Sequence, residues 1–411
     1  MARIGVIGAG IIGAAAATWL VGDGHAVTVF EPEPDGLPTS TGNAGLIALP
    51  EIAPIASLGM LSAIPKWLLD PLGPLTLRWQ DVPALTPWLL AFLASAEPIK
   101  VARSRKALTH LMSTALGDHE RLAAIAGLSG HLRQTGFISV HDSVGSLNGA
   151  LSEAAAVQSA LGYPYESLSV AAARSMVPRL EGAFAGAVHQ PGYWMVSDPL
   201  TVLRHYQDFL RQRAQFIAAK VSRVEPRQDG VAVWTEGQGE QIFDRVVIAA
   251  GIWSRTLVRG LGAKVLLENE RGYNTTFTDL GWNLNMPVGF ADHGFVATPL
   301  VGGLRVGGAV ELARPDTSPN FKRASAMRAK MRRYVPSLPD TGKEWMGRRP
   351  STPDSLPVIG QHPGDPRIVH AFGHGHLGLT LSAVTARLVA DLISSGPQDP
   401  AVAPFSLARF Q

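Results

Sequence analysis

Three glycines and one acid near the start of the chain have the spacing of a dinucleotide-binding site. Gly8, Gly10 and Gly13 follow a short apolar run, and Glu31 closes a second one. The first glycine permits a tight turn, the second lets a pyrophosphate approach the backbone, and the third lets a helix lie close to a sheet. The acid can accept hydrogen bonds from a ribose diol and would repel a ribose phosphate. The pattern predicts an unphosphorylated dinucleotide bound at a helix N-terminus.

A second glycine-rich loop lies near the far end of the chain, over Gly373-His374-Gly375-His376-Leu377-Gly378-Leu379-Thr380. It follows an apolar run at 368–371 and precedes a helical pattern that extends to about Ser394. Such a loop can stabilise an anion, for example the reduced ring of a flavin. His374 and His376 could form a metal pair, but no carboxylate or third histidine accompanies them nearby in the sequence. We therefore expect no metal site.

The residues around the first glycines predict a strand over 3–7, a helix that ends near Val21 and a strand over 26–30. A later apolar run, predicted as the strand 241–249, ends in the small-residue turn of Ala250, Gly251 and Trp253. Ligands of parallel sheets lie at the carboxyl ends of the strands, so this turn should face the same cofactor. A secretory signal is the alternative for the opening run, and the glycine spacing opposes it.

The region 258–344 has the alternation of an antiparallel sheet, one face of which could form a binding wall. We expect Tyr273 and His293 at the edges of this sheet. Its strands are predicted over 272–277, 295–298 and 304–310, with a hairpin turn at Gly302-Gly303. Other elements are predicted as helices over 101–126, 146–161, 201–213 and 322–333, the last with a solvated basic face, and as strands over 136–141, 187–193, 216–224 and 231–235.

Composition narrows the class of protein. The 411 residues are 46% hydrophobic and 17% charged, with a net charge of +3, which is typical of a globular enzyme with a large core. Apart from 322–333 there is no basic block, so we expect no nucleic-acid partner. The absence of cysteine excludes disulfides, thiolate metal sites and cysteinyl attachment of a flavin. We expect a cytoplasmic protein, with peripheral contact to the inner membrane as an alternative.

Residues 51–100 are aliphatic and tryptophan-rich, and prolines interrupt them repeatedly. No proline-free apolar run there approaches the roughly 20 residues that a spanning helix needs. We expect short helices that cover a substrate cavity. A contact with a membrane surface is the alternative.

Five separated motifs carry a resemblance to a known family. They are the opening fingerprint, the Ser40-Thr41-Gly42-Asn43-Ala44-Gly45 loop, Arg271-Gly272-Tyr273, the run from Gly347 to Gly360 and the loop from Gly373 to Thr380. In this order, and over nearly the whole length, the chain resembles the flavoprotein family of D-amino-acid dehydrogenases and glycine, sarcosine and D-amino-acid oxidases. The sequence of residues 374–380 is most similar to that of the bacterial dehydrogenases that oxidise cis-4-hydroxy-D-proline.

The resemblance implies an α/β fold in which a Rossmann-like FAD-binding domain (1–50, 197–257 and 345–411) adjoins an α+β substrate domain (51–196 and 258–344) built on an antiparallel sheet. It implies FAD as the cofactor. The residues expected to bind FAD are Gly8, Gly10, Ile11, Ile12, Gly13, Glu31, Ser40, Thr41, Asn43, Ala44, Gly45, Leu46, Val221, Ala250, Gly251, Trp253, Gly375, His376, Leu377, Gly378, Leu379 and Thr380.

The resemblance also implies that Arg349 grips a substrate carboxylate, which its two parallel N–H donors match. A surface ion pair is the alternative. Tyr273 is expected as a second carboxylate partner, with a buried sheet aromatic as the alternative. His376 completes the expected catalytic set, and Asn274, His293 and His374 are further expected substrate contacts.

The expected reaction is hydride transfer from the Cα of a D-amino acid, most simply a cyclic imino acid such as cis-4-hydroxy-D-proline, to flavin N5, which leaves an imine. A glycine or sarcosine oxidase that uses oxygen is the alternative within the class. An NAD-dependent dehydrogenase and a non-catalytic flavin-binding subunit are alternatives of other classes. The electron acceptor stays open between a quinone, an electron-transfer chain and oxygen.

Overall fold

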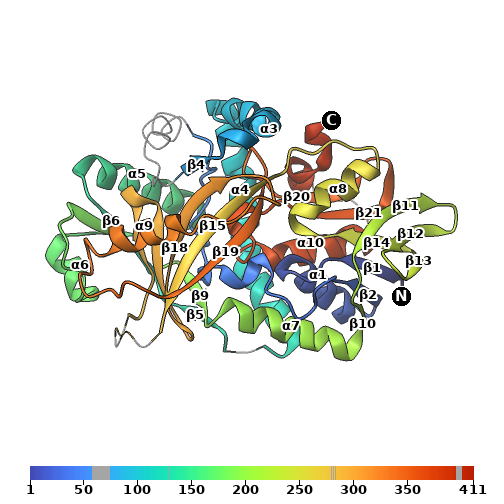
Figure 1. Ribbon diagram of the computed structural model, residues 1–411, viewed down its shortest axis with the longest axis horizontal. Helices are drawn as coiled ribbons and strands as arrows, with labels where there is room; N and C mark the ends of the chain where they lie inside the picture. Colours follow the sequence, from blue (N-terminus) through green and yellow to red (C-terminus); the bar gives the residue numbers. More distant parts are fainter. Residues whose placement is uncertain (58–74, 129, 279, 281, 283, 395–399) are drawn as a thin grey trace.

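The computed structural model describes residues 1–57, 75–128, 130–278, 280, 282, 284–394 and 400–411. Figure 1 shows two lobes side by side, one of which holds both chain termini. The chain passes between the lobes several times, so each lobe is assembled from segments that are far apart in the sequence.

A six-stranded sheet forms the first lobe, in the order β10-β2-β1-β14-β21-β20. All neighbouring strands are parallel except β20 and β21. The opening strand–turn–helix–strand unit is confirmed as β1, α1 and β2. The strands are β1 (Arg3–Ile7), β2 (Ala26–Phe30), β10 (Gln215–Ile217), β14 (Arg245–Ile248), β20 (Val358–His362) and β21 (Asp365–Phe372).

The two faces of this sheet are covered differently, because successive side chains of a strand point to opposite faces. Ile4 and Val6 of β1 belong to a core that includes α1 (Ile11–Gly22), α4 (Pro98–Ala126), α7 (Pro199–Arg213) and α10 (Ser382–Ser394). Ile7 belongs to a second core against the three-stranded sheet of β11 (Val221–Arg227), β12 (Gly230–Thr235) and β13 (Gly239–Phe243), with α8 (Ser254–Gly260). Asp198 caps α7 by accepting a hydrogen bond from the backbone N–H of Thr201 at 2.8 Å.

A nine-stranded sheet forms the second lobe, in the order β19-β15-β18-β17-β16-β6-β8-β7, with β4 also paired to β18. Most pairs are antiparallel, as expected, but β16 with β6 and β18 with β4 are parallel. The strands are β4 (Leu75–Leu77), β6 (Phe137–His141), β7 (Glu166–Leu168), β8 (Gly186–Gln190), β15 (Glu268–Phe277), β16 (Val288–Phe290), β17 (Phe295–Leu300), β18 (Gly303–Leu312) and β19 (Lys343–Ser351).

Smaller elements connect the lobes and cover the space between them. Part of the predicted helical cover over 51–100 is α3, while residues 58–74 of that range lie outside the described residues. The remaining elements are a three-stranded sheet of β3 (Leu46–Ile47), β5 (Leu132–Gln134) and β9 (Trp194–Val196), and the helices α3 (Val82–Ser95), α5 (Val144–Leu161), α6 (Val170–Met176) and α9 (Lys322–Met331).

Two predicted strands are wrong as single elements. The range 216–224 contains the end of β10 and the start of β11, and 241–249 contains parts of β13 and β14. In each case the two pieces pair in different sheets, so the chain must break between them. Asp244 marks one break, where its backbone N–H donates to the carbonyl of Arg3 at 2.9 Å. Hydrophobic alternation cannot reveal a break that long-range pairing imposes.

Three local expectations also need correction. Tyr273 lies in the middle of β15, between β18 and β19, and not at the edge of the sheet. The hairpin between β17 and β18 turns at 301–302, since Gly303 already pairs with Leu300. The predicted basic face of α9 is not wholly solvated, because Arg323 is only 2% exposed.

In the described part of the chain, no single helix is long and apolar enough to cross a bilayer. One pair of helical segments, 79–95 and 98–126, is long and apolar enough only when the two are taken together, and the chain bends by 90° between them.

Candidate active site

A cavity of about 1610 Å³ lies between the two lobes and is lined by residues of both. Its volume exceeds the roughly 300–1,000 Å³ of an ordinary ligand pocket, so it has room for a long cofactor and a small substrate. α3 covers part of it with Trp88, Leu89 and Phe92. Of the residues expected to bind FAD, those that line the cavity are Gly8, Gly10, Ile11, Ile12, Glu31, Ser40, Asn43, Ala44, Leu46, Val221, Ala250, Gly251, Trp253, Gly375, His376, Leu377, Gly378, Leu379 and Thr380.

The first glycine turn has the shape that a pyrophosphate needs. Gly8 has a φ of +100°, and a Cβ there would lie 2.6 Å from the carbonyl oxygen of Ala249. A Cβ on Gly13 would lie 1.9 Å from the carbonyl oxygen of Gly8, so α1 can approach β1 only with glycine at this position. Gly13 itself does not line the cavity. Glycine at position 13 instead lets the N-terminus of α1 lie close to the carboxyl end of β1.

Two side chains complete this end of the cavity. The Oγ of Ser40 accepts a hydrogen bond from the backbone N–H of Ile11 at 3.1 Å, at the start of α1. The Oε2 of Glu31 accepts one from the N–H of Ala9 at 2.8 Å. Glu31 thereby stands at the end of β2 beside the glycine turn, where an acid can meet a ribose diol. Thr41 and Gly45, also expected to bind FAD, do not line the cavity.

The loop over 373–380 is tied to the segment after β3 and to α10. The Oγ1 of Thr380 accepts a hydrogen bond from the N–H of Ala48 at 3.0 Å. The Nε2 of His374 lies 2.9 Å from the Oγ1 of Thr385 in α10. Burial lowers the pKa of His374 to about 3, so its ring is neutral at neutral pH. This histidine lines the cavity, but its imidazole also anchors the loop.

Arg349 lies on β19 and lines the cavity, as expected of a residue that binds substrate. It pairs in register with Glu270 of β15, so the two side chains share one face of the sheet. Its Nη1 lies 3.0 Å from the Oε1 of Glu270, while the Oε2 of Glu270 accepts a hydrogen bond from the Oγ of Ser351 at 2.9 Å. Glu270 lines the cavity and was not among the sequence candidates. Its position two residues before Gly272 in a family-like motif was the signal that could have found it.

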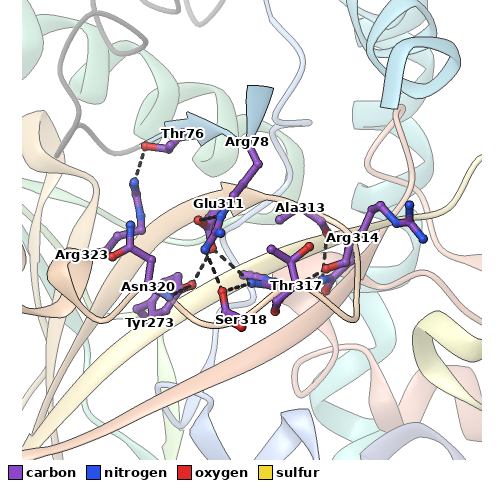
Figure 2. Close-up of polar contacts among 12 residues, drawn as sticks. Thr76, Arg78, Tyr273, Glu311, Ala313, Arg314, Thr317, Ser318, Asn320 and Arg323 are labelled. Carbon is purple, nitrogen blue, oxygen red and sulfur yellow. Dashed lines mark hydrogen bonds and ion pairs between the residues drawn. The ribbon is translucent and has the colours of Figure 1, made fainter. Parts of the chain in front are cut away.

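Tyr273 is placed differently from the expectation (Figure 2). Its hydroxyl donates to the Oε2 of Glu311 at 2.5 Å and accepts from the N–H of Asn320 at 3.0 Å. Glu311 is 1% exposed and also accepts from the Nε of Arg78 at 2.8 Å. The pKa of Tyr273 is raised, first by burial and then by the bond to Glu311. The hydroxyl of Tyr273 thus lies in a buried polar cluster, while Tyr273 is also one of the residues that line the cavity.

Two further expected substrate contacts are Asn274, which lines the cavity, and His293, which does not. The Nδ2 of Asn274 donates to the carbonyl of Gly42 at 2.9 Å and so joins β15 to the loop over 40–45, at the lining of the cavity. The Nε2 of His293 lies 2.9 Å from Asp142 Oδ2 and 2.8 Å from the Tyr334 hydroxyl. His293 does not line the cavity, since this cluster turns its ring away.

A second polar group in the cavity surrounds His376. Its Nε2 lies 3.3 Å from the Oε2 of Glu51, and the Tyr193 hydroxyl lies 3.5 Å from Oε1 of the same carboxylate. Burial raises the pKa of Glu51, but the hydrogen bonds of His376 and Tyr193 and the charge of His376 together outweigh it and leave the pKa below its ordinary value. Burial and the Glu51 charge raise the pKa of Tyr193 well above its ordinary value. Sequence reasoning missed Glu51 and Tyr193; an acid within an apolar stretch was the available signal for Glu51.

Arg305 of β18 is a further residue that sequence reasoning missed. Its Nη1 donates to the carbonyls of Thr41 and Asn43, at 3.0 and 2.6 Å. Burial lowers the pKa of this guanidinium below its ordinary value. Arg305 lines the cavity and holds the 40–45 loop through its backbone carbonyls. No local motif predicts this contact.

The glycine turn, Glu31 and the second glycine loop on one long cavity fit a dinucleotide with a ring system at its far end. Residues 3–392 match the family model described as FAD dependent oxidoreductase, DAO. The chain belongs to the DAO family. This family membership makes it an FAD-dependent oxidoreductase, and the alternative of an NAD-dependent dehydrogenase is wrong.

Relatives of this DAO-family chain extend over its whole length. It is 33% identical to a D-amino-acid oxidase of Bradyrhizobium diazoefficiens, over 99% of each chain, and 29% identical to a D-amino acid dehydrogenase of Methylobacterium nodulans, again over 99% of each. The structure resembles glycine oxidase from Geobacillus kaustophilus with a TM-score of 0.75 at 25% identity, over 100% of this chain and 99% of that one. The predicted fold class is confirmed.

Proposed function

We propose that this DAO-family enzyme oxidises the Cα–N bond of a D-amino acid. The observation that carries the proposal is the placement of Arg349, whose guanidinium faces the same cavity as the glycine turn and has one Nη held by Glu270 at 3.0 Å. The relatives named D-amino-acid oxidase and D-amino acid dehydrogenase support the D-configuration.

In this proposal the protein contributes binding and orientation. The N–H groups of Arg349 that Glu270 does not take bind the substrate carboxylate in two parallel hydrogen bonds. Bound FAD supplies a two-electron acceptor for the hydride of the broken Cα–H bond, while the lone pair of the unprotonated amine forms the C=N bond of the imine product. The apolar cover of Trp88, Leu89 and Phe92 excludes water from this end of the cavity.

We propose a cyclic D-imino acid such as cis-4-hydroxy-D-proline as the substrate. The polar group of Glu51, His376 and Tyr193 supports this choice, because its oxygens and ring nitrogen can meet a ring hydroxyl inside an otherwise apolar cavity. The second candidate is a glycine or sarcosine oxidase. It is favoured by the likeness to the Geobacillus kaustophilus glycine oxidase over the whole chain.

An anaerobic titration of the FAD-loaded protein tests these assignments. The visible flavin band is followed while cis-4-hydroxy-D-proline, D-proline, D-alanine, glycine, sarcosine or L-proline is added. We expect bleaching by the D-imino acids and none by L-proline. Bleaching by glycine and sarcosine alone would favour the second candidate, and no bleaching by any of them would contradict the proposed substrate class.

We propose a quinone or an electron-transfer chain as the acceptor of the electrons, reached at a membrane surface, with oxygen as the alternative. The support is an apolar patch at η2 (Trp79–Asp81), α3 and the start of α4, where Trp79, Leu90, Leu93 and Ile99 are 73%, 62%, 50% and 69% exposed. Leu93 also lines the cavity. Exposed apolar patches of this kind mark contact sites. Co-sedimentation with anionic vesicles should be lost in Leu90→Asp, and unchanged co-sedimentation would contradict the contact.

A further inference from the structure

We infer that Glu270 is a positioning residue that holds Arg349 ready for the substrate carboxylate. The inference rests on the proposed function, in which Arg349 binds that carboxylate. Glu270 on β15 lies directly opposite Arg349 on β19 in the antiparallel register. Directly opposite residues project from the same face of a sheet, and here that face lines the cavity.

Both oxygens of Glu270 are occupied by donors from β19. The Oε1 lies 3.0 Å from Arg349 Nη1, and the Oε2 accepts from Ser351 Oγ at 2.9 Å. The carboxylate is therefore fixed at two points and cannot rotate away from the arginine. The side chain of Glu270 is 8% exposed, whereas that of Arg349 keeps 27%. The pair thus covers the anchoring carboxylate and leaves part of the guanidinium accessible from the cavity.

Gly272 provides the surface on which the guanidinium lies. A Cβ at this position would lie 2.5 Å from Nη2 of Arg349 and 2.6 Å from its Cζ. The guanidinium therefore packs directly against the backbone of β15, next to Glu270. Any side chain at Gly272 would displace the guanidinium from this position.

The removal of Glu270 has two opposing effects on a carboxylate ligand. It would take a negative charge out of the wall, which favours an anion, and it would release a long flexible side chain that binding must then order again. We expect the second effect to dominate, because Glu270 is held by Ser351 and Arg349 is held by Glu270. The opposite result would mean that Glu270 competes with the substrate for Arg349.

Calorimetry with benzoate, a carboxylate without an amine, measures this directly on the FAD-loaded enzyme. Glu270→Ala should weaken benzoate binding roughly three- to tenfold, as expected when binding must order one freed, rotamer-rich side chain. KM for the D-amino acid should rise by a similar factor, while kcat at saturation and the flavin content stay within about threefold of wild type. Glu270→Gln keeps an acceptor for Arg349 and should restore most of the benzoate affinity.

Glu268→Gln is the matched control. Glu268 lies two residues away on the same strand, is 6% exposed, and pairs with Arg255 at 2.5 Å, but it does not line the cavity. Its variant should leave benzoate affinity within twofold of wild type. Equal loss in both variants would mean general damage to the sheet and would overturn the inference.

Benzoate affinity within twofold of wild type in Glu270→Ala, or tighter binding in Glu270→Gln, would overturn the inference. If Glu270→Ala does not fold, Gly272→Ala tests the same geometry. Benzoate should bind at least about tenfold more weakly to this variant, because the added Cβ displaces the guanidinium, and unchanged affinity would likewise overturn the inference.

Arg349→Ala separates the proposed function from the proposed role of Glu270. If it too leaves benzoate bound, the carboxylate site of the proposed function is wrong, whereas loss in Arg349→Ala alone contradicts only the role of Glu270.

Discussion

The two ends of the cavity are built in different ways. At the glycine turn, the backbone of one strand–turn–helix unit makes the surface, and contacts such as Ala9 with Glu31 join residues that are 22 positions apart. At the substrate wall, side chains from two strands make the surface, and Arg349 meets Glu270 across 79 positions. The first end depends on which residues are small, and the second depends on which residues oppose one another in a sheet.

The two ends therefore differ in the substitutions that they tolerate. A backbone site fails when a side chain enters it, because the turn or the helix must then move. A side-chain site fails when one partner is lost, while the fold and the other end of the cavity can persist. Substitutions at the glycine turn should therefore abolish cofactor binding, whereas substitutions at the substrate wall should weaken substrate binding and leave the cofactor bound.

The largest effect is expected at the glycine turn. Gly13→Val should abolish FAD binding, because even a Cβ would lie 1.9 Å from the carbonyl oxygen of Gly8 and would force α1 away from β1. Flavin content after purification measures this. Gly117→Ala is the control, since a Cβ there meets nothing within 4 Å. A Gly13→Val protein that retains FAD would show that close helix packing is not what forms the cofactor site.

The next effect is expected at Arg349. Arg349→Ala should lower kcat/KM by roughly 10²–10³-fold, about 3–4 kcal/mol, while FAD stays bound. Steady-state kinetics and flavin content together check this result. Arg255→Ala is the matched control, because Arg255 pairs with Glu268 of β15 at 2.5 Å but does not line the cavity. Loss of FAD in Arg349→Ala would contradict the separation of the two ends.

A smaller effect is expected at Tyr273, and on stability instead of catalysis. Tyr273→Phe removes a hydrogen bond to the buried carboxylate of Glu311 and should lower the free energy of unfolding by roughly 1.5–3 kcal/mol. KM should stay within about threefold of wild type. Urea unfolding and steady-state kinetics give the two quantities. A rise in KM of tenfold or more without loss of stability would restore Tyr273 as a carboxylate partner.

The last effect concerns the pH dependence of stability at His374. The pKa of this histidine is about 3 in the folded protein and 6.5 in the unfolded chain, so the unfolded chain binds the proton first and stability is lost as the pH falls from about 6.5 toward about 3. His374→Gln should flatten the slope between pH 4.5 and 5.5 by about 1.4 kcal/mol per pH unit. Urea unfolding at several pH values measures the slope.

His370 provides a comparison for His374 in the same measurement. Burial also lowers the pKa of His370 to about 3, but His370 does not line the cavity. His370→Gln should flatten the slope by the same amount without changing KM. An unchanged slope in His374→Gln would mean that His374 does not lie neutral and buried in the folded protein.

The cofactor end was largely predictable from sequence. β1, α1 and β2 formed where expected, and most residues expected to bind FAD line the cavity. Arg349, which a motif marked, lines the cavity, and its binding of a substrate carboxylate stays a prediction. Glu270, Glu51 and Arg305 were missed, since each acts through a partner from a distant segment that only the tertiary structure brings near it.

The errors share the same physical origin. Two strands were predicted as one where consecutive residues pair in different sheets, and Tyr273 was expected at a sheet edge where β15 in fact pairs with β18 and β19 on its two sides. Side chains of a strand alternate between two faces, and pairing with distant strands decides which face meets the cavity.

The dinucleotide site could be predicted from the sequence, because the turn, the helix and the closing acid lie within one local unit whose spacing is set by covalent connectivity. The tertiary structure alone decided the partners at the substrate wall. Register places Glu270 directly opposite Arg349, and the packing of segments from the whole length of the chain brings Glu311 to the hydroxyl of Tyr273 and Asp142 to His293.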